Sequence, residues 1–458
     1  MITMKTKGEL RAKLAAMVVF SGLAIGNVSA QNPIIRNQFS ADPSARVFNG
    51  KVYVFPSHDI PTPSEKPGRK DWFCMEDYHV FSSENLTDWT DHGVIVSQEN
   101  VPWVDSTSYS MWAPDCIERN GKYYFYFPAN TKVVDANGRK GFGIGVAVAD
   151  KPEGPYLPQS TPIEGVHGID PNVFIDKDGQ AYLYWSMGRI FVAKLKENML
   201  ELDSEPMAIA NLPEKGLKEG PYLFERNGIY YLTFPHVENT IERLEYATAD
   251  NPMGPFTMKG VIMDELPMNC WTVHQSVINF QEQWYLFYHQ NEYSPKFDKN
   301  RSVCMDSLSF NPDGSICKVI PSRRGVGLTS ASSQIQPDRY SAKSEDVSIA
   351  FLDTANTFAG WKTVLPNEGD WVQYNAVDFG DGKLKALQLR VQSQNKTMLK
   401  ICLDNLNGKE LVRQQIPAKS GWQLIDVSGL PALAGVHNLV ICLVGENPVE
   451  IDWIQFKP

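Results

Sequence analysis

The sequence predicts an all-β protein, in which a five-bladed β-propeller is followed by a β-sandwich (jelly-roll) domain. Three observations predict this fold class. A hairpin-like phrase recurs five times between residues 41 and 288. From Asn32 to about Arg324, short aromatic and β-branched runs alternate with Gly, Pro, Asn and Asp, and no long stretch keeps a helical period. After residue 346 the pattern changes to short alternating runs between turns, which is typical of a β-sandwich.

The repeated phrase consists of a short apolar run, a tight polar turn and an aromatic-rich run. Asn-Gly or Asp-Gly between two such runs is the strongest short-range signal for a β-hairpin. Repeats at intervals of roughly 50 to 70 residues, with several strands in each, are typical of propeller blades. A single β-sandwich is the alternative, but it does not explain the matched spacing. The copies are ADPSARVFNGKVYVF (41–55), PDCIERNGKYYFYF (114–127), DPNVFIDKDGQAYLYW (170–185), EGPYLFERNGIYYLTF (219–234) and HQSVINFQEQWYLFY (274–288).

Residues 1–30 are predicted to be a secretory signal peptide. Four basic residues between positions 5 and 13 precede an apolar run from Leu14 to Ile25, and Val28-Ser29-Ala30 resembles a cleavage site. We therefore expect a mature chain that begins near Gln31 and is secreted or periplasmic. A retained anchor is the alternative, but the apolar run is short for a membrane span, so no membrane span is expected.

The net charge and the cysteine pattern limit the ligands and metal sites that the sequence predicts. The formal net charge is −10 at pH 7, and loss of the basic signal peptide makes the mature chain more acidic. Nucleic acids and anionic membranes are therefore not expected as partners, whereas a neutral carbohydrate is compatible with this charge. The seven cysteines contain no Cys-x-x-Cys pair, so a zinc site of that type is not predicted. One or two disulfides and the oligomeric state are left open.

Changes in composition set the domain boundaries. The propeller is predicted to span residues 31–327. Residues 328–346 are rich in Ser, Gln and Ala, as in a linker. Residues 347–458 form the predicted β-sandwich, whose length of about a hundred residues is ordinary for one domain.

Four carboxylates and a histidine occupy the same position in the five copies of the phrase, one in each copy. Each precedes the tyrosine after its turn by nine to twelve residues, so each is expected at the start of an innermost strand, facing the central channel. Glycoside hydrolysis needs one carboxyl group that donates a proton and another that activates water or attacks the sugar. A third carboxylate nearby can keep the acid protonated. The five residues are Asp42, Asp115, Asp170, Glu219 and His274.

The order of the motifs ADP, WAPD, IDPNVF and EGPYL resembles that of glycoside hydrolase family 43, over residues 32–324. That family consists of five-bladed propellers, and its members are inverting enzymes. The resemblance implies that Asp42 is the general base, Asp170 the carboxylate that raises the pKa of the acid, and Glu219 the general acid. Asp115 in WAPD does not match a catalytic residue of the family, and we interpret it as supporting or structural.

Further residues of the propeller are candidates for binding the substrate or an ion. By the same resemblance, Arg301 lies near the sugar, and His274 approaches a bound ion or water in the channel, where calcium or another ion is possible. No other cofactor is expected. Trp112, three residues before Asp115, is the preferred aromatic platform for a sugar, since aromatic faces stack on sugar rings. Phe39 and Trp271 occupy similar positions, and packing between blades is the alternative for all three.

The C-terminal domain resembles carbohydrate-binding module family 6, through GDWVQYNAVDFG, SGWQLIDV, GVHNLVICLVG and VEIDWIQF. The resemblance implies a sugar held between Trp422 and Tyr374. Glu450 stands where the family has an asparagine, and a carboxylate lacks the amide donor. A domain that only packs against the propeller is therefore the alternative.

These features predict a secreted inverting glycosidase that removes terminal α-L-arabinofuranosyl groups from plant hemicellulose or pectin side chains. A β-xylosidase or an exo-galactanase of the same family is the alternative. A noncatalytic carbohydrate-binding protein is the alternative of another class. The complete set of Asp42, Asp170 and Glu219 favours an enzyme, because binding alone does not require it.

Overall fold

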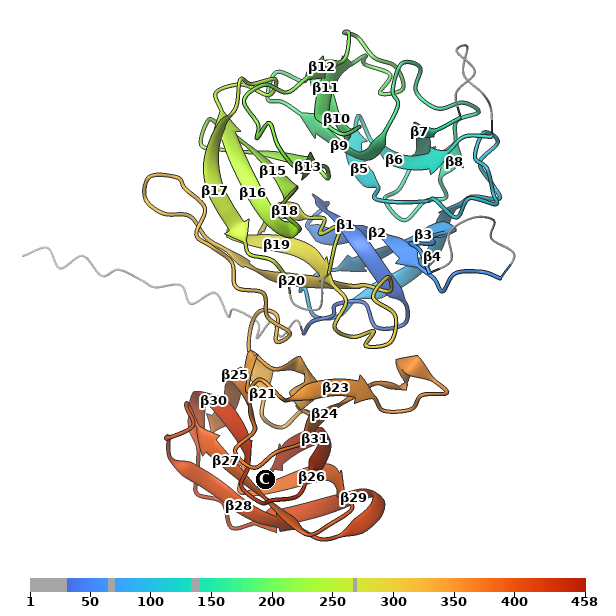
Figure 1. The fold of residues 1–458 in the computed structure, drawn as a ribbon. Coiled ribbons are helices and arrows are strands. Elements are labelled where there is room, and N and C mark those ends of the chain that lie inside the picture. Colours follow the sequence, from blue (N-terminus) through green and yellow to red (C-terminus); the bar gives the residue numbers. More distant parts are fainter. Residues whose placement is uncertain (1–30, 65–70, 133–139, 267–269) are drawn as a thin grey trace, which may run out of the picture.

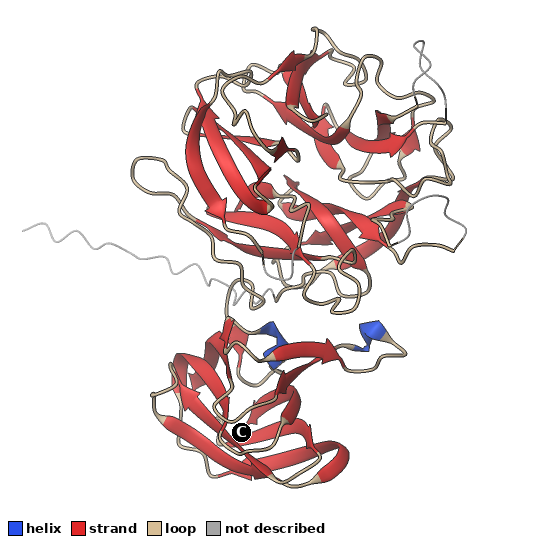
Figure 2. Cartoon of the chain, in the orientation of Figure 1, coloured by secondary structure: helices blue, strands red, loops and turns tan. Residues whose placement is uncertain are grey.

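The computed structural model describes residues 31–64, 71–132, 140–266 and 270–458, so the predicted signal peptide lies outside the described residues. Among the described residues, no helix is both long and apolar enough to cross a membrane. Figures 1 and 2 show a ring of β-sheets next to a separate β-sandwich, which confirms the predicted fold class.

Five sheets of the described chain form the blades of the propeller. Each copy of the repeated phrase supplies the antiparallel hairpin at the start of one blade. Blade 1 contains β1 (Phe39–Phe48), β2 (Lys51–Asp59), β3 (Asp77–Ser83) and β4 (Thr90–Ser97). Blade 2 contains β5 (Asp115–Arg119), β6 (Lys122–Asn130), β7 (Phe142–Ala149) and β8 (Leu157–Pro158). Blade 3 contains β9 (Ile169–Ile175), β10 (Ala181–Ser186), β11 (Ile190–Leu195) and β12 (Met207–Ala208).

The last two blades differ in the number of strands. Blade 4 contains β13 (Leu217–Lys218), β14 (Tyr222–Arg226), β15 (Ile229–Glu238), β16 (Ile241–Ala249) and β17 (Thr257–Met263). Blade 5 contains β18 (Ser276–Phe280), β19 (Gln283–Gln290) and β20 (Ser302–Leu308). Apolar clusters fill the spaces between neighbouring blades, and one of them packs blade 5 against blade 1. The ring is therefore closed by burial of apolar side chains.

Three of the five hairpin turns have the two-residue form expected for Asn-Gly. Asn49-Gly50, Asn120-Gly121 and Asn227-Gly228 all have positive φ at both positions, as a type I′ turn requires. The fifth turn is Gln281-Glu282, which holds φ values of 50° and 65° without a glycine.

Glu282→Gly is therefore expected to stabilise the propeller by roughly 0.5–1 kcal/mol. The left-handed conformation costs a residue with a Cβ about 1–2 kcal/mol, and the greater freedom of glycine in the unfolded chain offsets part of that gain. Urea unfolding followed by tryptophan fluorescence measures the change. Gly228→Glu, at the equivalent turn of blade 4, is the matched control and should shift the midpoint in the opposite direction. A lower midpoint for Glu282→Gly would contradict this account.

The C-terminal domain consists of two facing sheets. One contains β21 (Thr329–Ser330), β22 (Ala342–Lys343), β25 (Trp371–Asp381), β27 (Thr397–Leu403), β28 (Glu410–Ile416) and β30 (Ala434–Leu443). The other contains β23 (Ser348–Phe351), β24 (Trp361–Leu365), β26 (Ala386–Ser393), β29 (Lys419–Ser428) and β31 (Val449–Lys457). Their inner faces form one apolar core.

Residues 328–346, predicted as a linker, are part of the sandwich rather than a free connector. β21 and β22 both pair with β25, and Ile335 pairs with Ile454 of β31. Between them lies the short 3-10 helix η2 (Pro337–Arg339), whose residues are buried. The polar composition misled the prediction, because these residues pair with the sheet through their backbone, which composition does not reveal.

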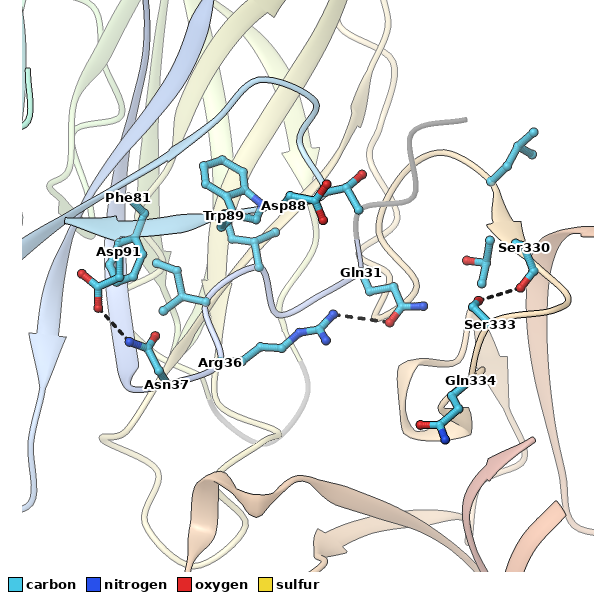
Figure 3. Close-up of a pocket in the computed structure, with 15 residues that line it drawn as sticks. Gln31, Arg36, Asn37, Phe81, Asp88, Trp89, Asp91, Ser330, Ser333 and Gln334 are labelled. Atoms are coloured by element: carbon cyan, nitrogen blue, oxygen red, sulfur yellow. Dashed lines mark hydrogen bonds between the residues drawn. The ribbon is translucent and has the colours of Figure 1, made fainter. Parts of the chain in front are cut away.

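The sandwich packs against the propeller. Tyr293 of the propeller is fully buried among core residues of the sandwich, and its carbonyl accepts a hydrogen bond of 3.0 Å from Nε1 of Trp361. A cleft of about 790 Å³ lies where the N-terminal segment and blade 1 meet residues 328–334 (Figure 3). None of the three predicted catalytic carboxylates lines this cleft.

Candidate active site

Asp42 and Asp170 occupy strained positions at the starts of β1 and β9. Each is followed by proline, has a positive φ (50° and 57°) and lies next to an irregularity in strand pairing. Left-handed backbone is unfavourable for residues with a Cβ and is concentrated at functional sites. Both residues are only 5% exposed. A bulge of this kind redirects a side chain, here that of a buried carboxylate.

Asp42 is held as an ionised carboxylate. Its two oxygens accept hydrogen bonds of 3.0 and 3.3 Å from the guanidinium of Arg301, and Oδ2 accepts a third, of 2.6 Å, from the hydroxyl of Ser57. Burial alone would raise the pKa of Asp42, but Arg301, His289, His274 and Ser57 together lower it below its usual value. An ionised carboxylate of this kind is suited to accept a proton.

Arg301 is fixed by a second carboxylate. The carboxylate of Asp59 accepts hydrogen bonds of 2.9 and 2.8 Å from Nε and Nη2 of Arg301, and a further one of 2.8 Å from its backbone N–H. Arg301 is 2% exposed, and Thr272 accepts another hydrogen bond from it. The structure therefore places Arg301 against the predicted base.

Asp170 and Glu219, on neighbouring blades, are carboxyls with raised pKa values. Burial, the charge of Glu219 and the charge of Asp42 raise the pKa of Asp170 well above its usual value. Burial and the charge of Asp42 raise the pKa of Glu219 to about 7, although Arg301 opposes this. The two carboxyls therefore share protons at neutral pH. Asp170 also accepts a hydrogen bond of 3.0 Å from the N–H of Gly220, which favours its charged form and opposes part of the rise in its pKa.

Gly220 fixes the position of Glu219. Its φ is 53°, and an added Cβ would lie 3.0 Å from Nδ1 of His274 and 3.1 Å from Pro235. The carbonyl of Gly220 accepts a hydrogen bond of 2.9 Å from the buried amide of Gln275. A residue without a side chain is therefore required after the predicted acid.

His274 is 8% exposed, and its ring lies against Gly220. Burial lowers its pKa, so that the ring is neutral at pH 7, although the charges of Asp42 and Asp115 oppose this. A neutral ring retains a nitrogen that accepts a hydrogen bond or binds a cation.

Asp115 has a structural role. Its carboxylate accepts hydrogen bonds from Arg46 and Ser44 of blade 1 and from Asn172 and Val173 of blade 3. It therefore ties three blades together around the channel, as the supporting interpretation predicts.

Trp112 contacts Tyr78, which lies near Asp42 and Asp170. Its carbonyl accepts a hydrogen bond of 2.7 Å from Tyr78, whose pKa is raised by burial and by the charges of Asp42 and Asp170. The indole is half-buried and packs against Phe142, with ring centroids 4.7 Å apart and ring planes tilted by 39°. Contact of Trp112 with a sugar stays a prediction.

The two other aromatic candidates differ in exposure. Trp271 is 39% exposed. Phe39 is 7% exposed and packs at 5.2 Å against Phe358 of the sandwich, so its ring presents little surface to a sugar.

The sequence did not single out three residues of the site. Asp59 holds Arg301, and the fully buried His289 accepts a hydrogen bond of 3.0 Å from the N–H of Asp42. Glu242 of blade 4 is 3% exposed, and burial together with the charge of Glu219 raises its pKa to about 8, although the N–H of Val273 opposes this. None of the three occupies the repeated register, so the repeat held no signal for them.

Comparison with known proteins places this site in a family. The model described as "Glycosyl hydrolases family 43" matches residues 30–316. The chain belongs to glycosyl hydrolase family 43. It is therefore a glycoside hydrolase, and the resemblance of its motifs to that family is confirmed. A second model, "Carbohydrate binding module (family 6)", matches residues 341–458.

Some relatives of this family 43 protein align with about three fifths of its chain, and others align with nearly all of it. It is 39% identical to "Xylosidase/arabinosidase 43A" of Humicola insolens, over 62% of this chain and 98% of that protein. It is 29% identical to "Arabinoxylan arabinofuranohydrolase" of Bacillus subtilis, over 94% of this chain and 93% of that protein. Among solved structures, a family 43 β-xylosidase/α-arabinofuranosidase from a compost metagenome in complex with xylotriose is 34% identical, with a TM-score of 0.56 over 64% of this chain and 97% of that one.

The sandwich of this family 43 enzyme does not assemble the sugar site predicted for it. Tyr374 is 1% exposed, and its hydroxyl hydrogen-bonds to Gln31 at 2.6 Å and to Thr329 at 3.0 Å, so the predicted stacking of Tyr374 on a sugar is wrong. It lies on β25 of one sheet, whereas Trp422 lies on β29 of the other.

The remaining two candidates of the sandwich have protein partners. Trp422 is half-buried beneath the guanidinium of Arg390, which lies 4.9 Å from the ring centre. Glu450 forms an ion pair of 2.8 Å with Lys362 and accepts a hydrogen bond from Gln392. Binding of sugar by Trp422 and Glu450 stays a prediction.

The cysteines all lie in the described parts of the chain, where they form no disulfide. All seven are free, and six of them are buried.

Proposed function

We propose that this enzyme is a secreted or periplasmic inverting glycosidase, which removes terminal α-L-arabinofuranosyl groups from hemicellulose or pectin side chains. One observation carries the proposal. Asp42, which Arg301 keeps ionised, interacts electrostatically with Glu219, whose pKa is about 7. A base and an acid are thereby present in one site at neutral pH, as glycoside hydrolysis requires.

In the proposed mechanism, Asp42 accepts a proton from a water molecule, which attacks the anomeric carbon. Glu219 donates its proton to the departing glycosidic oxygen, while Asp170 orients Glu219 and keeps it protonated. Arg301 holds Asp42 ionised, so that it is ready to take up the proton. Since the water adds from the face opposite to the leaving group, the configuration at the anomeric carbon is inverted.

A β-xylosidase is the second candidate. The names of the relatives favour it, since they join xylosidase and arabinosidase activities in one protein. Hydrolysis of aryl α-L-arabinofuranoside and aryl β-D-xyloside, followed by NMR of the first sugar released, tests both candidates. We expect faster release of arabinose, with inverted configuration. Preferred release of xylose would establish the second candidate, and retained configuration would overturn the mechanism.

An ion at His274 is a separate proposal. Calcium takes six to eight oxygen ligands. The nearby carboxylates of Asp42 and Asp115 are already occupied by Arg301 and Arg46. These residues therefore do not provide enough free oxygens to enclose a calcium ion. They fit an ion that is bound mainly by water and that His274 contacts through a water molecule.

The rate of hydrolysis should fall as the pH rises through about 7. Glu219 acts only when protonated, and burial and the charge of Asp42 raise its pKa to about 7. Full activity is thus expected below that pH, with a roughly tenfold loss per pH unit well above it. Measurement of kcat on an unactivated oligosaccharide from about pH 5 to about pH 9 tests this. In the Glu219→Gln variant this fall in rate above about pH 7 should be absent. If the fall persisted in that variant, another group would be responsible for it.

A further inference from the structure

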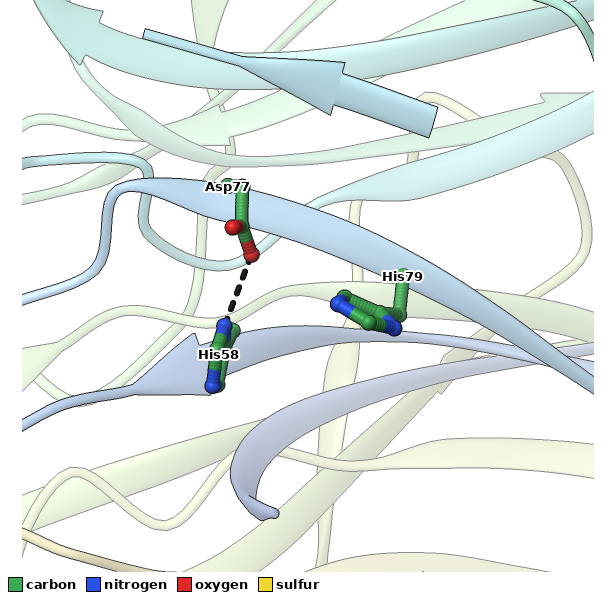
Figure 4. A group of neighbouring side chains, drawn as sticks. All are labelled: His58, Asp77 and His79. Atoms are coloured by element: carbon green, nitrogen blue, oxygen red, sulfur yellow. Dashed lines mark hydrogen bonds and ion pairs between the residues drawn. The ribbon is translucent and has the colours of Figure 1, made fainter. Parts of the chain in front are cut away.

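A cluster of two histidines and an aspartate lies on blade 1, on the face opposite to the active site. His58 is on β2, and Asp77 and His79 are on β3 (Figure 4). Their neighbours Ser57 and Tyr78 are paired in register, and Ser57 contacts Asp42. Because alternate residues of a strand point to opposite faces, the cluster lies behind the strands that hold the predicted base. One potential ligand atom from each residue lies within 4.8 Å of the other two.

One ring nitrogen of His79, Nδ1, already has a carboxylate partner. Its Nδ1 lies 2.9 Å from Oδ1 of Asp91 on β4. Asp91 is itself fixed, by the N–H of Gly93 at 2.8 Å and by the amide of Asn37 at 2.7 Å. A carboxylate that accepts the Nδ1 proton leaves a lone pair on Nε2, which is the usual arrangement around a histidine that binds a metal.

His58 and Asp77 supply the other two ligand atoms. Nδ1 of His58 lies 2.7 Å from Oδ1 of Asp77, and the two histidine rings are 5.4 Å apart at 72°. A proton therefore lies between Nδ1 of His58 and Oδ1 of Asp77, and both of these atoms would bind the metal ion. The three side chains are only 15–21% exposed, so they are held in place and yet can be reached from solvent.

We propose that His58, Asp77 and His79 bind a divalent transition metal of the zinc class, with Asp91 as the outer partner of His79. Two imidazoles and one carboxylate suit zinc, whereas calcium and magnesium prefer oxygen alone. With bonds of about 2.0–2.2 Å, the ligands of a tetrahedral zinc ion are roughly 3.3 Å apart. Binding therefore moves Nδ1 of His58 and Oδ1 of Asp77, now 2.7 Å apart, slightly away from each other and draws the ligand atom of His79 closer. The metal displaces the proton shared by His58 and Asp77, and water completes its coordination.

The role of such an ion is to join β2 to β3. His58 lies between Ser57, which contacts Asp42, and Asp59, which holds Arg301. A metal here does not face the sugar, because it lies on the other face of the sheet. It should therefore raise the thermal stability of the propeller without taking part in hydrolysis.

Titration of the full-length protein with zinc after dialysis against EDTA tests the proposal. Isothermal calorimetry should show a zinc site, and the midpoint of thermal unfolding should rise with zinc. Cobalt(II) should give the intense visible absorption of a tetrahedral site. Asp77→Asn and His79→Gln should each weaken zinc binding by at least about tenfold, as loss of a ligand does.

Two controls separate this site from others. His437→Gln removes a histidine of the sandwich that contacts Asp404 and the carbonyl of Ala434, and it should leave zinc binding unchanged. His274→Gln should likewise retain the site, which separates it from an ion in the channel. Zinc binding that survives in both Asp77→Asn and His79→Gln, or that is lost in His274→Gln, would overturn the proposal. If the variants do not fold, crystals of the unaltered protein soaked in zinc should show an anomalous peak between His58 and His79, and its absence would be equally decisive.

Discussion

Replacement of Asp42 by asparagine is expected to reduce hydrolysis of every substrate by roughly 10²–10⁴-fold. Asparagine has nearly the same shape, its amide oxygen can still accept a hydrogen bond from Arg301, and its amide N–H can donate to the hydroxyl of Ser57. However, it cannot accept a proton from water. Because the base is needed whatever group departs, aryl glycosides and natural oligosaccharides should suffer alike.

Glu219→Ala provides the matched comparison. An aryl group with a low pKa leaves without a proton, so this variant should lose far less activity on such aryl glycosides than on oligosaccharides. Measurement of kcat/KM for both variants on both substrate types tests the two roles. Equal losses on both substrates in Glu219→Ala would contradict its role as the acid. More than a tenth of the activity remaining in Asp42→Asn, on any substrate, would contradict its role as the base.

Arg301→Met is expected to destabilise the propeller by about 3–5 kcal/mol and to inactivate the enzyme. Arg301 is 2% exposed and is the guanidinium partner of two buried carboxylates, Asp42 and Asp59. Removal of one partner from a buried ionic network leaves uncompensated charge, which is the costly case. The pKa of Asp42 should also rise, because Arg301 is the strongest of the groups that lower it.

A double variant distinguishes this explanation from loss of packing. In Arg301→Met/Asp59→Asn, one of the uncompensated charges is removed, so part of the lost stability should return. Urea unfolding of the single and double variants measures it. Arg413→Met breaks an exposed ion pair with Glu410 and should leave the unfolding midpoint unchanged. A double variant no more stable than Arg301→Met would show that packing dominates.

The sequence determined the blades and the axial residues, because both follow from local chemistry. Asn-Gly turns and aromatic runs specify a hairpin within about fifteen residues. Once five such hairpins share a register, one residue ahead of each must face the channel. Asp42, Asp170, Glu219 and His274 could therefore be selected without coordinates, and the structure brings them into electrostatic contact.

The tertiary structure decided how these residues are held. Arg301 and Asp42 are 259 positions apart, and the partner that fixes Arg301, Asp59, stands outside the repeated register. Likewise, the burial of Tyr374 depends on the packing of the sandwich against the propeller. Local patterns specify hairpins and the faces of strands, whereas partners across blades and domains depend on how the blades close into a ring, which no single stretch of sequence encodes.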